Sequence, residues 1–69
     1  MLVFKLRIQM AIHKMNISDL SEKTGIRRQT ISNYYNETYK HIVKEHLEAF
    51  IKVFNCDITD LLEWKDDEK

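Results

Sequence analysis

The chain of 69 residues contains no proline, a single glycine and a single cysteine. With no proline and with glycine only at position 25, the sequence favours helices joined by tight corners. The one cysteine, Cys56, excludes an internal disulfide framework, which fits the reducing cytoplasm. The chain also lacks an apolar run of about 18 residues, so it predicts no membrane-spanning helix.

Residue sets that would support catalysis are also missing. There are no paired carboxylates in a recognisable arrangement, no nucleophile with a plausible base, and no glycine-rich phosphate loop. His13, His41, His46 and Cys56 match no zinc motif, because the sequence has no C-x-x-C pair and no helical spacing between His41 and His46. We therefore expect no enzyme activity, no metal site, no other cofactor and no small-molecule ligand.

Charge is present in equal amounts of both signs but is distributed unevenly. Residues 1–44 carry eight cations and three acids, a net of +5, whereas residues 45–69 carry three cations and eight acids, a net of −5. A domain polarised in this way can present a basic surface to phosphate although its total charge is zero. A single domain spanning residues 1–69 is expected, with roughly 3–5 kcal/mol of net stability, which dimerisation commonly raises.

The pattern of apolar residues predicts a compact, all-α domain of five helices. A first helix begins at Leu6, a second runs from the N-cap Asn16 to Gly25, and a third begins at Arg28. Residues 36–43 are expected to form a loop, followed by a fourth helix over residues 44–54 and a last short helix that Asp57 caps.

The segment around the first helix is apolar on two sides, which is typical of an element that is covered twice. Leu6, Met10 and His13 share one face, and the opposite side carries Phe4, Ile8, Ala11, Ile12 and Met15. Trp64 lies near the end of the chain, where burial within one small domain is not assured. We therefore expect residues 2–5 to pair with residues 62–65 as short strands, within one chain or between two, with terminal or dimer packing by Phe4, Ile12 and Trp64.

The third helix combines a core side with an unpaired polar side. Ile31 and Tyr34 fall on one side, and the other carries Arg28, Gln29, Ser32, Asn33 and Asn36. A helix held by its neighbour, with long hydrogen-bonding side chains facing outward, is typical of an element that reads DNA. The alternative is an ordinary solvated helix face.

An ordered set of apolar and small residues runs through most of the chain: Leu20, Ser21, Gly25, Ile26, Ile31, Tyr34, Leu47, Phe50, Phe54 and Leu61. The spacing of this set resembles that of the Cro/C1-type, lambda repressor-like helix-turn-helix domain. The segment TISNYYNETYK and the ending DLLEW are similar to those of compact single-domain regulators of this type. The resemblance covers nearly the whole chain, with the helix-turn-helix at residues 16–36 and its recognition helix at about 28–36.

The resemblance implies roles for particular residues. Proteins of this type present certain side chains to base edges in the major groove, and the residues at those positions here are Arg28, Gln29, Ser32 and Asn33. Those at positions that contact phosphates are Asn16, Arg27, Asn36, Thr38 and Lys40. The implied partners are double-stranded DNA and a second copy of the chain.

Several positions depart from the pattern of the family. Glu37 stands where these proteins have glycine, which places an acid close to the expected phosphate. Ser21 replaces a common alanine. Met10 and Tyr35 replace an arginine and a glutamate that form a salt bridge in many relatives, so we expect packing in its place.

These features together predict a cytoplasmic, DNA-binding transcriptional regulator, a repressor, that acts as a homodimer. The alternative is a protein-interaction module, such as an antitoxin-like or anti-repressor partner, that retains the fold. The zero net charge, Glu37 and the apolar residues Phe4, Ile12 and Trp64 favour this alternative.

Overall fold

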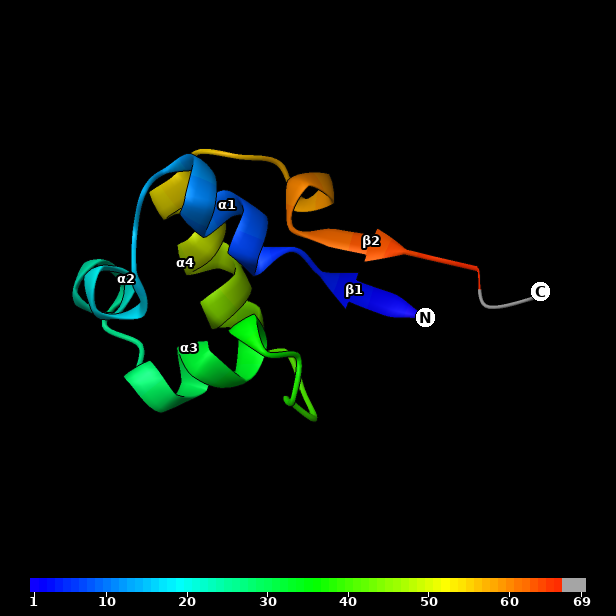
Figure 1. Ribbon diagram of the computed structural model, residues 1–69, viewed down its shortest axis with the longest axis horizontal. Helices are drawn as coiled ribbons and strands as arrows, with labels where there is room; N and C mark the ends of the chain where they lie inside the picture. Colours follow the sequence, from blue (N-terminus) through cyan, green and yellow to red (C-terminus); the bar gives the residue numbers. More distant parts are fainter. Residues whose placement is uncertain (67–69) are drawn as a thin grey trace.

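The computed structural model describes residues 1–66, which form four α-helices, a 3₁₀ turn and a two-stranded sheet (Figure 1). The elements in chain order are β1 (Leu2–Phe4), α1 (Leu6–Ile12), α2 (Ile17–Thr24), α3 (Arg28–Tyr35), α4 (Lys44–Phe54), η1 (Ile58–Asp60) and β2 (Leu62–Trp64). None of the helices in residues 1–66 is long and apolar enough to cross a membrane.

The prediction of five helices is wrong at the C-terminal end. Asp57 does cap the last turn, since its carboxylate accepts the N–H of Ile58 at 2.9 Å, but that turn is a 3₁₀ turn of three residues. It ends there because residues 62–64 are extended and pair with β1. The cap signal predicts where the turn begins, whereas the pairing with β1 limits its length.

All four α-helices are followed by a residue with a left-handed backbone, although the chain has one glycine. Gly25 takes this role after α2 with φ of 77°, and the others are Lys14, Glu37 and Asn55, with φ of 56°, 57° and 51°. After α3, Thr38 N–H donates to the Asn33 carbonyl at 2.9 Å and Glu37 N–H to the Tyr34 carbonyl at 3.2 Å, which is the Schellman arrangement. Asparagine tolerates this conformation, but lysine and glutamate adopt it at a cost.

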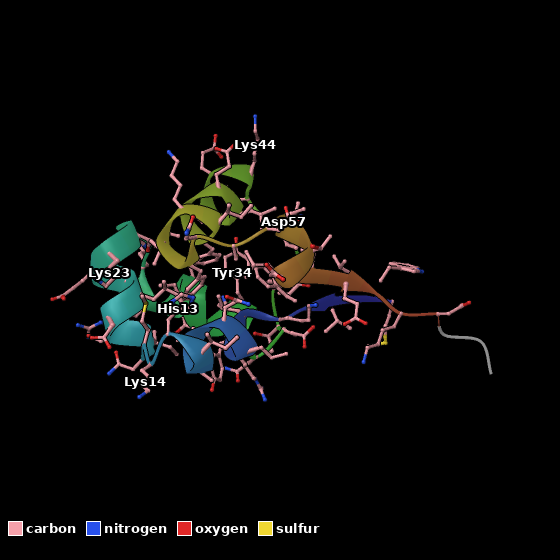
Figure 2. The ribbon with its side chains drawn as sticks, turned by 90° about the horizontal axis from the view of Figure 1, so that it is seen from above. His13, Lys14, Lys23, Tyr34, Lys44 and Asp57 are labelled. Atoms are coloured by element: carbon pink, nitrogen blue, oxygen red, sulfur yellow. The ribbon has the colours of Figure 1, made fainter. Side chains whose placement is uncertain are left out.

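The core is centred on Tyr34 of α3, which Figure 2 shows in the middle of the molecule while Lys14, Lys23 and Lys44 lie at its periphery. The Tyr34 ring lies 5.2 Å from that of Phe4 and 5.8 Å from that of Phe50. The fully buried side chains are Leu6, Leu20, Ile31, Tyr34, Phe50, Phe54 and Leu61. Leu47 and Ile51 of α4, which the pattern predicts in the core, are only partly buried. These contacts fix which side of α3 faces the core.

The predicted pairing of the two ends of the chain is present within one molecule. β1 and β2 are antiparallel, with Leu2 opposite Trp64, Val3 opposite Glu63 and Phe4 opposite Leu62. Lys5 N–H extends the ladder by donating to the Leu61 carbonyl at 2.6 Å. Figure 1 shows this ribbon projecting from one end of the helical body.

Candidate nucleic-acid interface

The corner between α2 and α3 is fixed by side-chain hydrogen bonds around a buried isoleucine. Ile26 is 7% exposed and directly follows Gly25. Its N–H donates to Thr24 Oγ1 at 3.2 Å, and its carbonyl accepts the Ser21 hydroxyl at 2.6 Å. The serine that replaces the common alanine thus holds the corner by a bond that alanine could not make. The angle between the two helices follows from these contacts.

The outward side of α3 is linked by hydrogen bonds one turn apart. Gln29 Nε2 donates to Asn33 Oδ1 at 3.0 Å, and Asn36 Nδ2 donates to Ser32 Oγ at 3.2 Å. Asn33 Oδ1 also lies 3.4 Å from the Thr38 hydroxyl. The polar side chains of α3 therefore form two hydrogen-bonded groups, one of Gln29, Asn33 and Thr38 and the other of Ser32 and Asn36.

These bonds limit what each side chain can offer to a ligand. Asn33 Oδ1 is already occupied, which leaves its amide protons as donors. Gln29 keeps its carbonyl oxygen and one amide proton, which is the acceptor and donor pair that an adenine edge requires. Arg28 is exposed at the first position of α3, and no hydrogen bond or ion pair within residues 1–66 engages its guanidinium. In this arrangement Arg28 and Gln29 are presented for contact, and Asn33 holds Gln29 in place.

The first turns of α2 and α3 differ in how their backbone N–H groups are satisfied. Asn16 and Asp19 form a capping box, in which Asp19 N–H donates to Asn16 Oδ1 at 2.7 Å. Arg27 precedes α3 in the N-cap position and makes no side-chain cap. The first N–H groups of α3 therefore remain available to an anion such as phosphate. At α2 the capping box satisfies the N–H groups of Asn16 and Asp19, and Asp19 already provides a negative group there.

The loop after α3 is attached to the N-terminal strand through Glu37. Its Oε1 accepts the N–H of Phe4 at 3.2 Å, from a residue 33 positions earlier in the chain. The carboxylate therefore points to the backbone of β1 and occupies an outward-facing N–H of that strand. Burial, and then the charges of Glu37 and Tyr34, raise the pKa of the neighbouring Tyr39 above its ordinary 10.0, so that its hydroxyl stays neutral at physiological pH.

Glycine substitutions at two equivalent left-handed positions should separate backbone strain from this hydrogen bond. Lys14→Gly should raise the free energy of unfolding by about 0.5–1 kcal/mol, because relief of the left-handed strain exceeds the added entropy of the unfolded chain. Glu37→Gly relieves the same strain but loses the bond to Phe4, so it should be about 1 kcal/mol less favourable than Lys14→Gly. Urea unfolding followed by circular dichroism measures both, and equal gains would show that the bond contributes nothing.

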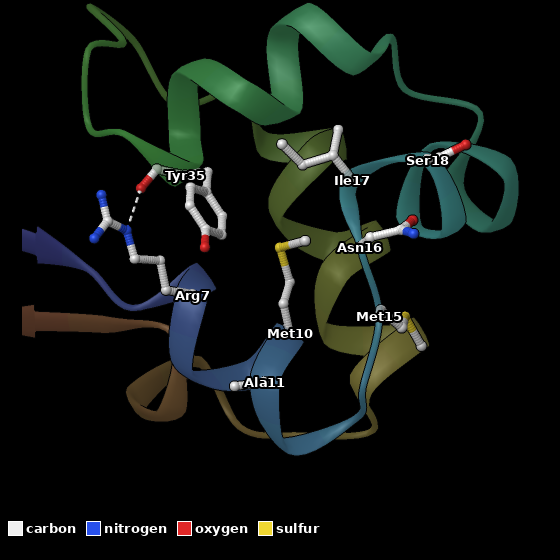
Figure 3. A pocket seen from close by; sticks show the side chains of 8 residues that line it. All are labelled: Arg7, Met10, Ala11, Met15, Asn16, Ile17, Ser18 and Tyr35. Carbon is white, nitrogen blue, oxygen red and sulfur yellow. Dashed lines mark hydrogen bonds between the residues drawn. The ribbon is translucent and has the colours of Figure 1, made fainter.

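A second attachment joins α1 to the end of α3. Arg7 Nε donates to the Tyr35 carbonyl at 3.0 Å, and the guanidinium carbon lies 4.8 Å from the centroid of the Tyr35 ring. Figure 3 shows this pair at one wall of an open groove of about 580 Å³, with Met10 beside it and Asn16 across from it. Met10 and Tyr35 both line this groove, and the side chain that contacts Tyr35 is Arg7, one turn before Met10.

The predicted phosphate contacts near α3 are exposed, whereas the residues predicted for dimer or terminal packing do not lie together. Thr38 and Lys40 are exposed in the loop after α3, and Asn36 is exposed at its end. Phe4 is 3% exposed and belongs to the core, so it cannot form a dimer surface, whereas Ile12 and Trp64 are 63% and 73% exposed on separate elements. The two attachments by Arg7 and Glu37 were not predicted, and the only sequence signal for Glu37 was its place at an expected glycine.

Within residues 1–66 no three His, Cys, Asp or Glu side chains are arranged to hold a metal ion. His46 Nδ1 instead lies 2.8 Å from the Tyr34 hydroxyl, and the ring of His13 lies 5.2 Å from that of Phe54. Burial, with the nearby carboxylates of Asp60 and Asp57, raises the pKa of the Cys56 thiol above its ordinary 9.0. Cys56 is thus a protonated, partly buried packing residue.

Comparison with known proteins gives two matches, and both include α2, α3 and the loop that follows α3. The chain matches the family model of the Cro/C1-type HTH DNA-binding domain over residues 5–67. It is also similar to the uncharacterized HTH-type transcriptional regulator YozG of Bacillus subtilis (strain 168). Their identity is 33% over 67 residues, which make up 97% of this chain and 80% of that protein. Every residue that the sequence predicts to contact DNA lies within the matched range.

Proposed function

The chain belongs to the family of Cro/C1-type helix-turn-helix DNA-binding domains, and we propose that it is a cytoplasmic transcriptional repressor that reads the major groove with α3. The observation that carries this proposal is the polar side of α3. Its side chains form two hydrogen-bonded pairs, Gln29 with Asn33 and Ser32 with Asn36, while Arg28 at its start has no partner within residues 1–66. A solvated helix face with no ligand has no need of such an arrangement.

In the proposed complex, phosphate contacts position α3 and base contacts select the sequence. Arg27 and Lys40 supply charge at the two ends of the surface, and the uncapped first turn of α3 donates N–H groups to a phosphate. Arg28 can pair with both acceptors of a guanine, and Gln29 can pair with an adenine. Asn33 keeps the Gln29 amide oriented, which reduces the entropy lost when Gln29 binds.

The negative charge of Glu37 opposes DNA binding, but its carboxylate also has a structural role that supports the proposed function. Its carboxylate accepts a backbone N–H from β1, and the same contact anchors the loop that carries Thr38 and Lys40. The residue therefore helps to fix the position of two proposed phosphate contacts. Its cost is the negative charge that it leaves near the DNA, which lowers affinity for any sequence equally.

We further propose that the protein binds as a homodimer to two half-sites separated by about 34–36 Å, one helical turn of DNA. A domain of this size gains stability by association. Two copies also double the number of phosphate contacts without any change in the surface of one copy.

Titration with a random-sequence DNA duplex at two salt concentrations tests the proposal. If Arg27 and Lys40 of both copies each neutralise a phosphate, the slope of log K against log salt is about −3.6, and a fourfold rise in salt weakens binding about 150-fold. One copy acting alone would give half this slope. Absence of binding, or binding that does not depend on salt, would contradict DNA binding and favour the protein-interaction module. The exposed Ile8 and Ile12 of α1 would then be the first surface to test.

A further inference from the structure

The ribbon formed by β1 and β2 has one apolar and one polar face. Residues directly opposite each other in a sheet project to the same side, so Leu2, Phe4, Leu62 and Trp64 share one face. The other face carries Val3 and Glu63, and Glu63 lies 3.9 Å from the ammonium group of Lys5. At the inner end of the apolar face, Phe4 is buried in the core. At the outer end, Leu2 and Trp64 are 41% and 73% exposed.

From this we infer that the outer part of the apolar face, Leu2 and Trp64, packs against the same residues of a second copy of the chain. The inference rests on the proposed function, for which it names the dimer surface. An isolated two-stranded ribbon is at best marginally stable in water, and only its inner half packs on the body. Because the exposed apolar face is continuous with the core, a second copy would extend that core across the dimer.

The arrangement of the ribbon relative to α3 selects this mode of association. In Figure 1, β2, β1 and α3 lie in that order from top to bottom, and in Figure 2, seen from above, the two strands nearly overlap. The line from the ribbon to α3 therefore lies in the plane of the ribbon, and the apolar and polar faces point to either side of that plane. A two-fold axis that runs parallel to this plane, over the apolar face and toward α3, stacks two ribbons face to face and turns both α3 helices to the same side, as a single DNA duplex requires.

Edge-to-edge pairing of the ribbons does not meet this requirement. Its axis is perpendicular to the sheet, so it turns the two α3 helices to opposite sides. The free edge of β1 is also partly occupied, because the outward N–H of Phe4 donates to Glu37. The protein is 40 Å long and 22 by 20 Å across, with the ribbon at one end of its length. Contact at the ribbon thus leaves room for half-sites about 34–36 Å apart.

The surface offered by two residues of each copy is small, so the dimer should dissociate on dilution. Sedimentation over a range of protein concentrations, with the full chain, measures this association. Leu2→Asp should raise the dissociation constant about 30-fold or more, because it places charge at the centre of the contact. Val3→Asp is the matched control, since it adds the same charge one residue away on the polar face and should leave association unchanged.

Trp64, the only tryptophan of the chain, reports on the same contact. Its emission should shift to shorter wavelength as the concentration of the wild-type protein or of Val3→Asp rises, and should not shift for Leu2→Asp. If Leu2→Asp does not fold, Trp64→Ser is measured by sedimentation in its place. A wild-type protein that stays monomeric, or a dimer that neither substitution weakens, overturns the inference. The salt titration with random DNA separates this inference from the proposed function, because a monomer retains the surface of α3 and should still bind DNA in a salt-dependent way, with half the slope.

Discussion

Replacement of Tyr34 by alanine should leave the chain unfolded at 25 °C. Loss of a large buried aromatic side chain costs about 3–5 kcal/mol, which equals the roughly 3–5 kcal/mol of net stability expected for a domain of this size. Tyr34 is 2% exposed and lies within 6 Å, between ring centroids, of Phe4, Tyr39, His46 and Phe50. Far-UV circular dichroism of the variant should show loss of helix, and a cooperative urea transition near that of the wild type would contradict the prediction.

Tyr34→Phe is the control that separates the hydroxyl from the ring. The hydroxyl accepts the N–H of Val43 at 3.2 Å, at the start of α4, and lies 2.8 Å from His46 Nδ1. Its removal leaves a donor and an acceptor without their partner, at a cost of about 1–3 kcal/mol. This variant should remain folded with a lower urea midpoint. Because α3 keeps its packing, its DNA affinity should also be preserved.

The parts of the fold that sequence predicts well are those with a local chemical signal. Asn16 and Asp57 both cap their turns as predicted, and Gly25 and Asn55 both adopt the left-handed conformation that ends a helix. Each of these residues acts on its own backbone neighbours. Their positions therefore follow from the identity of the residue, with little influence from distant parts of the chain.

The features that sequence did not predict depend on contacts between distant segments. Nothing in the side chain of Glu37 indicates a left-handed backbone, and its bond to Phe4 exists only because the two ends of the chain pair beside α3. Arg7 reaches Tyr35 because α1 packs across the end of α3. The last turn is shorter than predicted for the same reason, since the pairing of β2 with β1 overrides a local preference for helix.

Among DNA contacts, Arg28 should have the largest effect on sequence selectivity. A bidentate contact to guanine is worth about 1–3 kcal/mol, and the proposed dimer would make it twice. Arg28→Ala should therefore weaken binding to a selected palindromic site by about 2–6 kcal/mol, or roughly 30-fold to 2 × 10⁴-fold. Gel-shift titration on a duplex selected with the wild-type protein measures this change. Because Arg28 is exposed, the substitution should leave the urea midpoint almost unchanged.

Arg28→Lys distinguishes base reading from a simple effect of charge. Lysine keeps the positive charge but lacks the planar fork that pairs with two acceptors of one base. If Arg28 reads guanine, the lysine variant should bind random DNA like the wild type, with the same salt dependence, yet lose selectivity at one position of each half-site. If lysine instead restores full affinity for the selected site, Arg28 contacts phosphate, and the selectivity of α3 must come from Gln29 and the residues that orient it.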